Sequence, residues 1–425
     1  MRDLKQADLI VVAGQVATCA PGNAPRPGTK MDDAGLLSNS AVVIQGERIR
    51  AIGPSEVILK EWMGDTLEMP NSAVVPGFVD PHCHPLFAGS RLDEFVRRSQ
   101  GATYQQIHAS GGGIFSTVRA TRAASDEELM ARATSTIERM MAHGTTTLEA
   151  KSGYGLDTAQ ELRQLRLLRQ LGKNLDMDIV PTFMGAHAIP PEHADRREEY
   201  VRLVIEEMAP QARELADYAD IFCEEGAFTL KESERILTAC SALGFGLRIH
   251  AEEFTYQGGA RMAAGLGAIT VDHLQWLPDT DFEAIREAGT IPVLTPGTSF
   301  FLGHERFAPA RALLAADLPV ALGTDFNAGS CQTESMQAIL SLAVLRLRMT
   351  PAEALVAATV NAAHSLGRGD LVGSLEVGKK ADLLVLDLPD FAELPYRFGG
   401  NYVRAVIKSG VAVNTILDSP LGDPL

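Results

Sequence analysis

Residues 76–91 read PGFVDPHCHPLFAGSR, and this stretch decides how the rest of the chain is interpreted. An apolar run leads into it and ends at two histidines, His82 and His84, on either side of Cys83. In a β-strand the side chains at i and i+2 share a face, so both imidazoles project to one side and Cys83 to the other. Two imidazoles at the end of a buried strand favour a shared metal ion over two separately hydrogen-bonded histidines. Other parts of the chain must then supply the remaining ligands.

Strand-like and helix-like segments alternate from this stretch onward, which is typical of parallel βαβ units. Patterned helical segments such as DEELMARATSTIERMMAHG lie between the strand candidates. Eight apolar strands predict a (β/α)8 TIM-like barrel, since a doubly wound sheet, the alternative, usually has fewer strands. The eight strand candidates are AVVPGFVDPH (73–82), TTTLEAKSG (145–153), DIVPTFMGAH (178–187), YADIFCEE (218–225), GLRIHAEE (246–253), AITVDH (268–273), TIPVLTPG (290–297) and PVALGTDFN (319–327).

Both ends of the chain are rich in short β-like segments separated by Gly, Pro and Asn. Neither end is long enough to form a good core alone. We therefore predict that residues 1–74 and 371–425 pair into one small β-sandwich domain. The barrel, residues 75–370, is then an insertion between the two halves of that domain.

Composition limits the classes of partner. The 38 basic and 54 acidic residues give a formal net charge of −16, which argues against a nucleic-acid or anionic-membrane surface. A small-molecule substrate held by one or two local arginines remains compatible with this charge. The five cysteines are scattered without a CxxC pair, and neither a signal-peptide pattern nor an apolar run of membrane-spanning length is present. These features predict a soluble cytoplasmic protein.

Polar residues cluster where the predicted strands end, which is where a barrel of this kind forms its active site. His250 lies at the end of the fifth strand and Asp325 at the end of the eighth, so that together with His82 and His84 they bring three imidazoles and one carboxylate to one site. This set resembles the ligand logic of the amidohydrolase superfamily. It predicts one divalent or trivalent metal ion, zinc or iron, since both accept three histidines and an aspartate.

Three further residues could in principle bind metal. His273, at the end of the sixth strand, is expected to orient or polarise the substrate, with metal ligation as the alternative. Lys151 could be carboxylated and bridge two metals, but it follows the second strand, whereas superfamily members with such a bridge carry it on the fourth. Cys223 is soft enough for zinc and is a minor alternative. One metal is therefore expected rather than two.

Longer segments resemble the imidazolonepropionase family. They cover nearly the whole barrel and include GGGIFSTVRATRAAS (111–125), GTTTLEAKSGYGL (144–156), PTFMGAHAIPPE (181–192), IHAEEF (249–254), TPGTSFFLG (295–303) and GTDFNAGS (323–330). The resemblance implies hydrolysis of 4-imidazolone-5-propanoate to N-formimidoyl-L-glutamate in histidine degradation, and a homodimer, which is usual for the superfamily. Two positions depart from the family: Cys83 stands where Thr is common, and Ala328 where Pro is common.

The resemblance also implies which residues bind substrate. Arg91 would pair with the propionate, although a surface salt bridge is its alternative. Tyr154 and His187 would offer hydrogen bonds to the heterocycle and its carboxylate, although a buried structural role is the alternative for Tyr154. Glu253 would accept the ring N–H, with Glu252 as the alternative because strict alternation places it beside His250. The loop that follows the eighth strand would contact the carboxylate or ring through three further residues: Asn327, Gly329 and Ser330.

The implied chemistry is metal-assisted attack of water on the ring carbonyl. Asp325 is the expected proton shuttle with Glu253 assisting, and His273 is expected to polarise the carbonyl oxygen. Another cyclic amidohydrolase or a deaminase on the same frame is an alternative. A non-catalytic scaffold is a third possibility, but such a protein should have lost ligands, and all four are present here.

Overall fold

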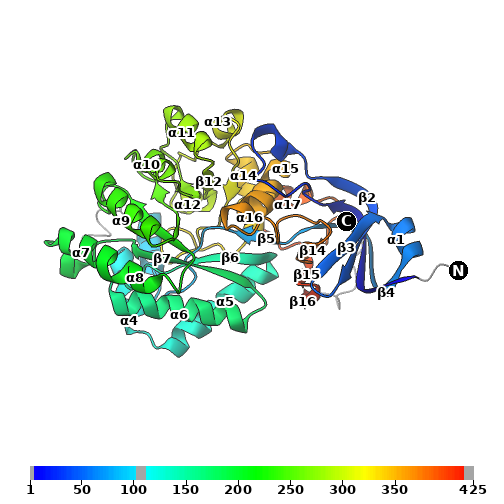
Figure 1. Ribbon diagram of the computed structural model, residues 1–425, viewed down its shortest axis with the longest axis horizontal. Coiled ribbons are helices and arrows are strands. Elements are labelled where there is room, and N and C mark those ends of the chain that lie inside the picture. Colours follow the sequence, from blue (N-terminus) through cyan, green and yellow to red (C-terminus); the bar gives the residue numbers. More distant parts are fainter. Residues whose placement is uncertain (1–3, 102–111, 416–425) are drawn as a thin grey trace.

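A computed structural model describes residues 4–101 and 112–415 of the chain. Parallel strands form the predicted barrel, with their order following the sequence around the sheet (Figure 1). β9 and β10 both pair with β8, so together they fill one position of the barrel. The barrel strands are β5 (Phe78–Asp80), β6 (Thr145–Lys151), β7 (Asp178–Ala186), β8 (Tyr218–Cys223), β9 (Gly246–Leu247), β10 (His250–Ala251), β11 (Thr270–His273), β12 (Ile291–Leu294) and β13 (Ala321–Leu322).

Beyond the last ladder, the chain itself closes the barrel between its first and eighth strands. Cys83 forms an isolated parallel bridge with Phe326. On either side of this bridge, the Asp325 N–H donates to the His82 carbonyl at 2.9 Å, and the His84 N–H donates to the Phe326 carbonyl at 2.8 Å. The two predicted ligand segments are therefore hydrogen-bonded neighbours at the seam of the barrel.

The predicted first strand, residues 73–82, is wrong in its extent. Residues 73–76 belong to β4 (Trp62–Pro76) of a second sheet, and only Phe78–Asp80 pairs within the barrel. His82 and His84 therefore lie just past the strand rather than within it. An apolar run does not reveal that its two halves join different sheets, because both halves are buried.

Helices surround the barrel strands, as the helical periodicity predicts. Ser125, Asp157 and Thr229 cap α5, α6 and α9, since each side chain accepts a backbone N–H of the first turn. The helices are α1 (Ser55–Glu61), α2 (Leu92–Ser99), α4 (Ile114–Ala123), α5 (Asp126–Ala142), α6 (Thr158–Asn174), α7 (Arg197–Leu203), α8 (Ala209–Ala212), α9 (Leu230–Ala242), α10 (Gly259–Gly265), α11 (Phe282–Glu287), α12 (Pro296–Phe301), α13 (Ala310–Ala315), α14 (Met336–Leu345), α15 (Pro351–Val356), α16 (Ala362–Ser365) and α17 (Glu393–Tyr396).

Strands from both ends of the chain pair into one mixed sheet, in the order β16-β15-β14-β4-β1-β2-β3. Alternate residues of its strands fill different apolar clusters: Val11 and Val42 lie in one, and Ile10 and Val43 in the other. Register shifts interrupt several of its ladders and bend the sheet. Its other strands are β1 (Lys5–Ala17), β2 (Leu36–Gln45), β3 (Arg48–Pro54), β14 (Leu383–Leu386), β15 (Val403–Lys408) and β16 (Val411–Thr415).

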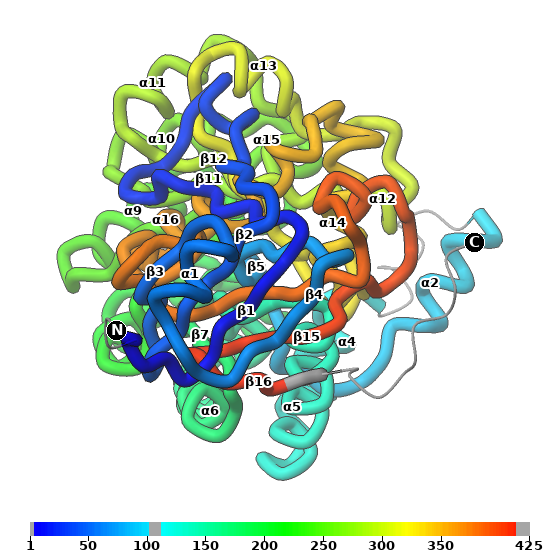
Figure 2. Tube along the Cα trace, turned by 90° about the vertical axis from the view of Figure 1, so that its right-hand side faces the viewer, coloured from blue at the N-terminus to red at the C-terminus, as the bar shows by residue number. Residues whose placement is uncertain are grey.

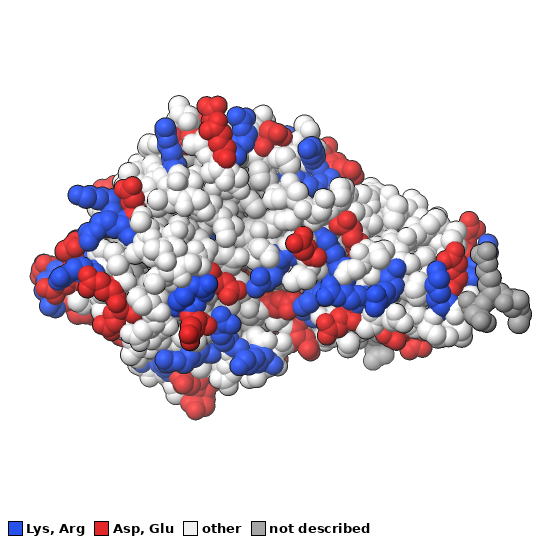
Figure 3. Space-filling view, in the orientation of Figure 1, with Lys and Arg blue, Asp and Glu red and all other residues white. Residues whose placement is uncertain are grey.

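This sheet lies at one end of the elongated molecule and against the barrel (Figures 1 and 2). Leu384 and Val406 of the sheet belong to the same apolar cluster as the barrel core. The predicted domain limits remain a prediction, and their outermost residues, 1–3 and 416–425, lie outside the described part of the chain. On the face drawn in Figure 3, basic and acidic side chains are interspersed. Among the described residues, no helix is both long and apolar enough to cross a membrane.

Candidate active site

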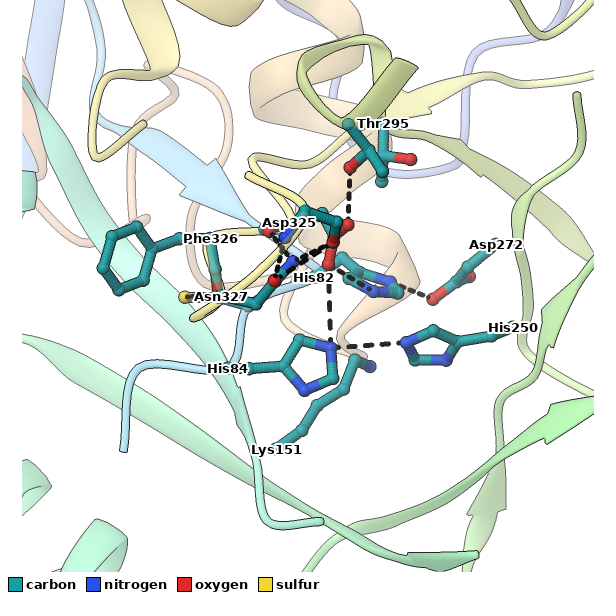
Figure 4. A network of polar contacts seen from close by, with 12 residues as sticks. His82, His84, Lys151, His250, Asp272, Thr295, Asp325, Phe326 and Asn327 are labelled. Atoms are coloured by element: carbon teal, nitrogen blue, oxygen red, sulfur yellow. Dashed lines mark hydrogen bonds and ion pairs between the residues drawn. The ribbon is translucent and has the colours of Figure 1, made fainter. Parts of the chain in front are cut away.

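Four side chains converge at the carboxyl ends of the barrel strands (Figure 4). His82 Nε2 lies 3.4 Å from Asp325 Oδ1, and His84 Nε2 lies 3.7 Å from the same oxygen. His250 Nε2 lies 3.3 Å from His84 Nε2. His82 Nε2 is buried and has no hydrogen-bond partner among the described residues. Buried nitrogen lone pairs that converge beside a carboxylate fit a metal ion, since they otherwise lack a partner.

Two aspartates that the sequence pattern did not reveal orient two of these imidazoles. His82 Nδ1 donates to Asp272 Oδ2 at 2.6 Å, and His250 Nδ1 donates to Asp220 Oδ1 at 3.0 Å. A histidine that donates Nδ1–H to a carboxylate presents the lone pair of Nε2 to a metal. The sequence does carry a signal for these two aspartates, because each is an acidic residue inside a mostly apolar strand segment, YADIFC for Asp220 and TVDH for Asp272.

The ionisation of the histidine pair also suits metal ligation. Burial lowers the pKa of His82 and of His84 well below the usual value, and the neighbouring cationic and imidazole groups lower it further. Both rings are therefore neutral at physiological pH, which is the form that binds metal.

Asp325 occupies a constrained position opposite the histidines. Its φ of 49° is in the left-handed region, so the chain turns sharply as it leaves β13. Thr298, on α12, donates its hydroxyl to Asp325 Oδ2 at 2.5 Å, which leaves Oδ1 directed at His82 and His84. Burial raises the pKa of Asp325 to about 6, against the opposing effect of the Thr298 hydrogen bond.

His273 lies on the far side of the same centre. Its ring centroid is 5.0 Å from those of His82 and His250, and Nδ1 lies 3.0 Å from Thr295 Oγ1. Nε2 is buried without a hydrogen-bond partner in the described chain. One nitrogen each of His82, His250 and His273 could contact a common ion. This geometry is compatible with both predicted alternatives, a metal ligand and a substrate-polarising group.

The two neighbouring glutamates have different surroundings. Glu252 has a φ of 53°, and its carboxylate accepts three backbone N–H groups at the start of α10, those of Gln257, Gly259 and Ala260. The left-handed turn directs the next side chain toward the site, which strand alternation alone does not predict. Glu253 Oε1 lies 3.9 Å from His273 Nδ1. Burial raises the pKa of Glu253 well above its usual value, and the charges of Asp325 and Glu224 raise it further.

Tyr154 and His187 flank the centre on the side of β6 and β7. The His187 ring stacks on His84 with centroids 5.1 Å apart, and Tyr154 lies 5.5 Å from His187. His187 Nδ1 lies 3.1 Å from the Gly153 carbonyl. Both side chains are therefore held in place beside the histidine cluster, as a substrate-contacting role requires.

The remaining predicted substrate residues lie at the rim of the site. Arg91 Nε and Nη2 donate to Glu94 Oε2 at 2.9 and 2.8 Å, so the salt bridge considered as an alternative is present. Asn327 Oδ1 accepts the N–H groups of Gly329 and Ser330, both at 2.8 Å. The Asn327 side chain thus shapes its own loop, and its contact with substrate remains a prediction.

The two other candidate ligands are engaged by groups other than the four converging side chains. The Lys151 ammonium is buried between Glu149 and Asp220, at 2.6 and 2.7 Å. The thiol of Cys223 lies close to the backbone of Gly259, in α10. The groups of described His, Cys, Asp and Glu side chains that could hold a metal ion do not include Cys223. All the other predicted site residues lie at the carboxyl end of the barrel or in its loops.

The sequence model of the amidohydrolase family matches residues 73–413. The chain therefore belongs to the amidohydrolase family, whose members are hydrolases. Solved structures with the same fold include an adenosine deaminase from Xanthomonas campestris with bound zinc. It superposes with a TM-score of 0.71 at 21% identity, over 97% of this chain and 94% of that one.

Within that family, the chain belongs with the imidazolonepropionases. It is 46% identical to the imidazolonepropionase of Symbiobacterium thermophilum over 415 residues, 96% of this chain and 97% of the relative. It is also 46% identical to that of Solibacter usitatus over 403 residues, 94% of this chain and 96% of the relative. The family and the converging donor atoms together indicate that the site holds a metal ion.

Proposed function

We propose that the protein hydrolyses the ring amide of 4-imidazolone-5-propanoate and releases N-formimidoyl-L-glutamate, a step of L-histidine degradation. The observation that carries this proposal is the arginine-bearing rim beside a buried His–Asp centre. Relatives at 43–46% identity that bear the name imidazolonepropionase support the same assignment.

We assign the metal ion, zinc or iron, to His82, His84, His250 and Asp325. When bound, such an ion supplies Lewis-acid catalysis, acidifying water and polarising a carbonyl. The protein contributes two imidazoles whose Nδ1–H groups are fixed by Asp220 and Asp272, and burial lowers the pKa of one of them, His82. The carboxylate of Asp325 is held in one orientation by Thr298.

The substrate is placed by groups on three sides of this centre. Arg91 pairs with the propionate, since a guanidinium offers two parallel N–H donors to a carboxylate. Tyr154 offers its hydroxyl to the substrate from the side of β6. His187, whose Nδ1–H donates to the Gly153 carbonyl, offers Nε2 as an acceptor from the side of β7. Glu253 accepts the ring N–H, because its carboxylate, unlike that of Glu252, faces the histidines.

Hydrolysis requires one proton transfer from water to the departing nitrogen. Water adds through its oxygen to the ring carbonyl carbon, and Asp325 accepts the released proton. His273 stabilises the negative charge that develops on the carbonyl oxygen. The C–N bond then breaks, and Asp325 returns the proton to the ring nitrogen with Glu253 assisting.

The decisive experiment is metal analysis of the purified protein together with an ultraviolet assay of imidazolonepropionate loss. We expect about one equivalent of zinc or iron, and product formation that stops when a chelator removes the metal. A metal-loaded protein that is inert on this substrate but opens other cyclic amides, or deaminates a purine, would overturn the assignment.

A further inference from the structure

We propose that Lys151 is a positioning residue of the metal centre. Its buried ammonium fixes the position of His250 relative to the segment that carries His82 and His84. This inference rests on the proposed metal-dependent function and gives a role to a residue that the mechanism above leaves unused. Lys151 ends β6, and its side chain is fully buried. Figure 4 shows it beside His84 and His250.

Through one of its contacts, the Lys151 ammonium is connected to His250, the predicted metal ligand on β10. Lys151 Nζ donates to Asp220 Oδ2 at 2.7 Å, while Asp220 Oδ1 accepts from His250 Nδ1 at 3.0 Å. The Ile221 N–H also donates to Asp220 Oδ1, at 2.7 Å. The two carboxylate oxygens therefore have separate partners, and the ammonium fixes the rotation of the carboxylate that orients the imidazole.

A second contact leads to the histidine pair after β5. Lys151 Nζ donates to Glu149 Oε1 at 2.6 Å, and Glu149 Oε2 accepts the backbone N–H of Cys83 at 3.2 Å. The backbone N–H of Lys151 also donates to the Cys83 carbonyl, at 3.0 Å. Since Cys83 separates His82 from His84, Lys151 links that segment to His250 through two carboxylates.

Stability alone is a weak reason for this arrangement. Burying an ammonium and two carboxylates is costly, and a well-packed apolar cluster is often as stable. Without the ammonium, Glu149 and Asp220 would retain like charges without this shared counter-ion, and Asp220 would be free to turn away from His250. Removing a group that orients a metal ligand typically weakens metal binding by about 10- to 100-fold.

The test compares two buried lysines, each bound to two carboxylates. Lys408 contacts Asp178 and Asp382 at 2.7 and 2.6 Å, on the mixed sheet and far along the chain from every predicted ligand. The measurement is transfer of Zn²⁺ from zinc-loaded holoenzyme to a chelating dye, with thermal unfolding of each variant in parallel. We expect Lys151→Met to bind Zn²⁺ about 10- to 100-fold more weakly. Lys408→Met should unfold at a lower temperature yet bind Zn²⁺ as the wild type does.

The outcomes separate this inference from the proposed function. Lys151→Met with wild-type Zn²⁺ affinity would overturn the positioning role while leaving the metal centre intact. A wild-type protein that binds neither zinc nor iron would overturn both. If Lys151→Met does not fold, Lys151→Met/Glu149→Gln removes an opposite pair of charges together. That double variant should still bind Zn²⁺ weakly, and wild-type affinity in it would refute the inference.

Discussion

At the scale of single residues, the role of His273 depends on its Nε2 atom, which its described neighbours leave without a hydrogen bond. Thr295 contacts Nδ1, while Nε2 faces the centre without a partner in the described chain. We expect His273→Ala to keep its metal and to lose turnover by about 100- to 1000-fold, as when one oxyanion donor is removed. Metal content and kcat measured on the same preparation provide the check. Loss of the metal in this variant would instead identify His273 as a ligand.

Gly329 is required for a different reason, namely the close approach of another side chain. A Cβ at this position would overlap the guanidinium of Arg91. Because Arg91 is long and flexible, Gly329→Ala should displace it without unfolding the protein. Losing its contact with the substrate carboxylate costs about 1.5–3 kcal/mol, so KM should rise roughly 10- to 150-fold.

Steady-state kinetics of Gly329→Ala, with kcat changing much less than KM, would confirm that Arg91 binds the ground-state carboxylate. The matched control is Gly265→Ala in α10, where a Cβ would meet open space and φ is not positive. An unchanged KM in Gly329→Ala would mean that Arg91 serves Glu94 rather than the substrate.

At the scale of elements, buried carboxylates hold the loops that carry the substrate-facing side chains. Glu161, in the first turn of α6, accepts the N–H groups of Gly153, Gly155 and Leu156, and so fixes the loop that presents Tyr154. Glu224 likewise accepts the N–H groups next to Glu253. These loops are therefore held in shape before substrate arrives.

Glu161→Gln tests this role, because the amide turns one N–H toward a backbone donor and leaves that donor unsatisfied. We expect a loss of about 1–3 kcal/mol in the free energy of unfolding and a higher KM, since Tyr154 is no longer held. Chemical denaturation and steady-state kinetics measure the two effects. Glu128→Gln, in the exposed first turn of α5, is the control and should change neither.

The barrel and much of the site could be predicted because their signals are local. Apolar runs mark all eight strand positions, and His250 and Asp325 lie where those strands end. The rest depended on contacts that no single stretch contains. Asp220 and Asp272 become meaningful only once each is paired with a histidine from a different strand. Likewise the left-handed turn at Glu252, which directs Glu253 inward, cannot be inferred from alternation.

At the scale of the whole molecule, an ionic cluster joins the mixed sheet to the barrel. Asp178, at the start of β7, accepts from Lys380 at 2.9 Å and from Lys408, on β15, at 2.7 Å. Lys408 also donates at 2.6 Å to Asp382, the residue directly before β14. The active-site end of the barrel carries the chemistry, so this opposite end is free to serve stability.

Asp178→Asn tests this junction through its pH dependence. Burial alone would raise the pKa of Asp178, but Lys408 and Lys380 outweigh it and hold that pKa below its usual value. A depressed carboxyl pKa stabilises the folded state above the unfolded pKa of about 4, and this contribution disappears as the pH falls through the folded value. Since Asp178 is 37% exposed, we expect Asp178→Asn to lose only about 1 kcal/mol at pH 7.

The difference between wild type and Asp178→Asn should shrink steadily as the pH falls below about 4, because the wild-type carboxyl then becomes protonated as well. Urea unfolding at a series of pH values measures it, and added salt should reduce the difference at neutral pH. Asp176→Asn, two residues earlier and exposed, is the control and should match the wild type throughout. A deficit in Asp178→Asn that persists unchanged in acid would show that Asp178 acts through packing rather than through its charge.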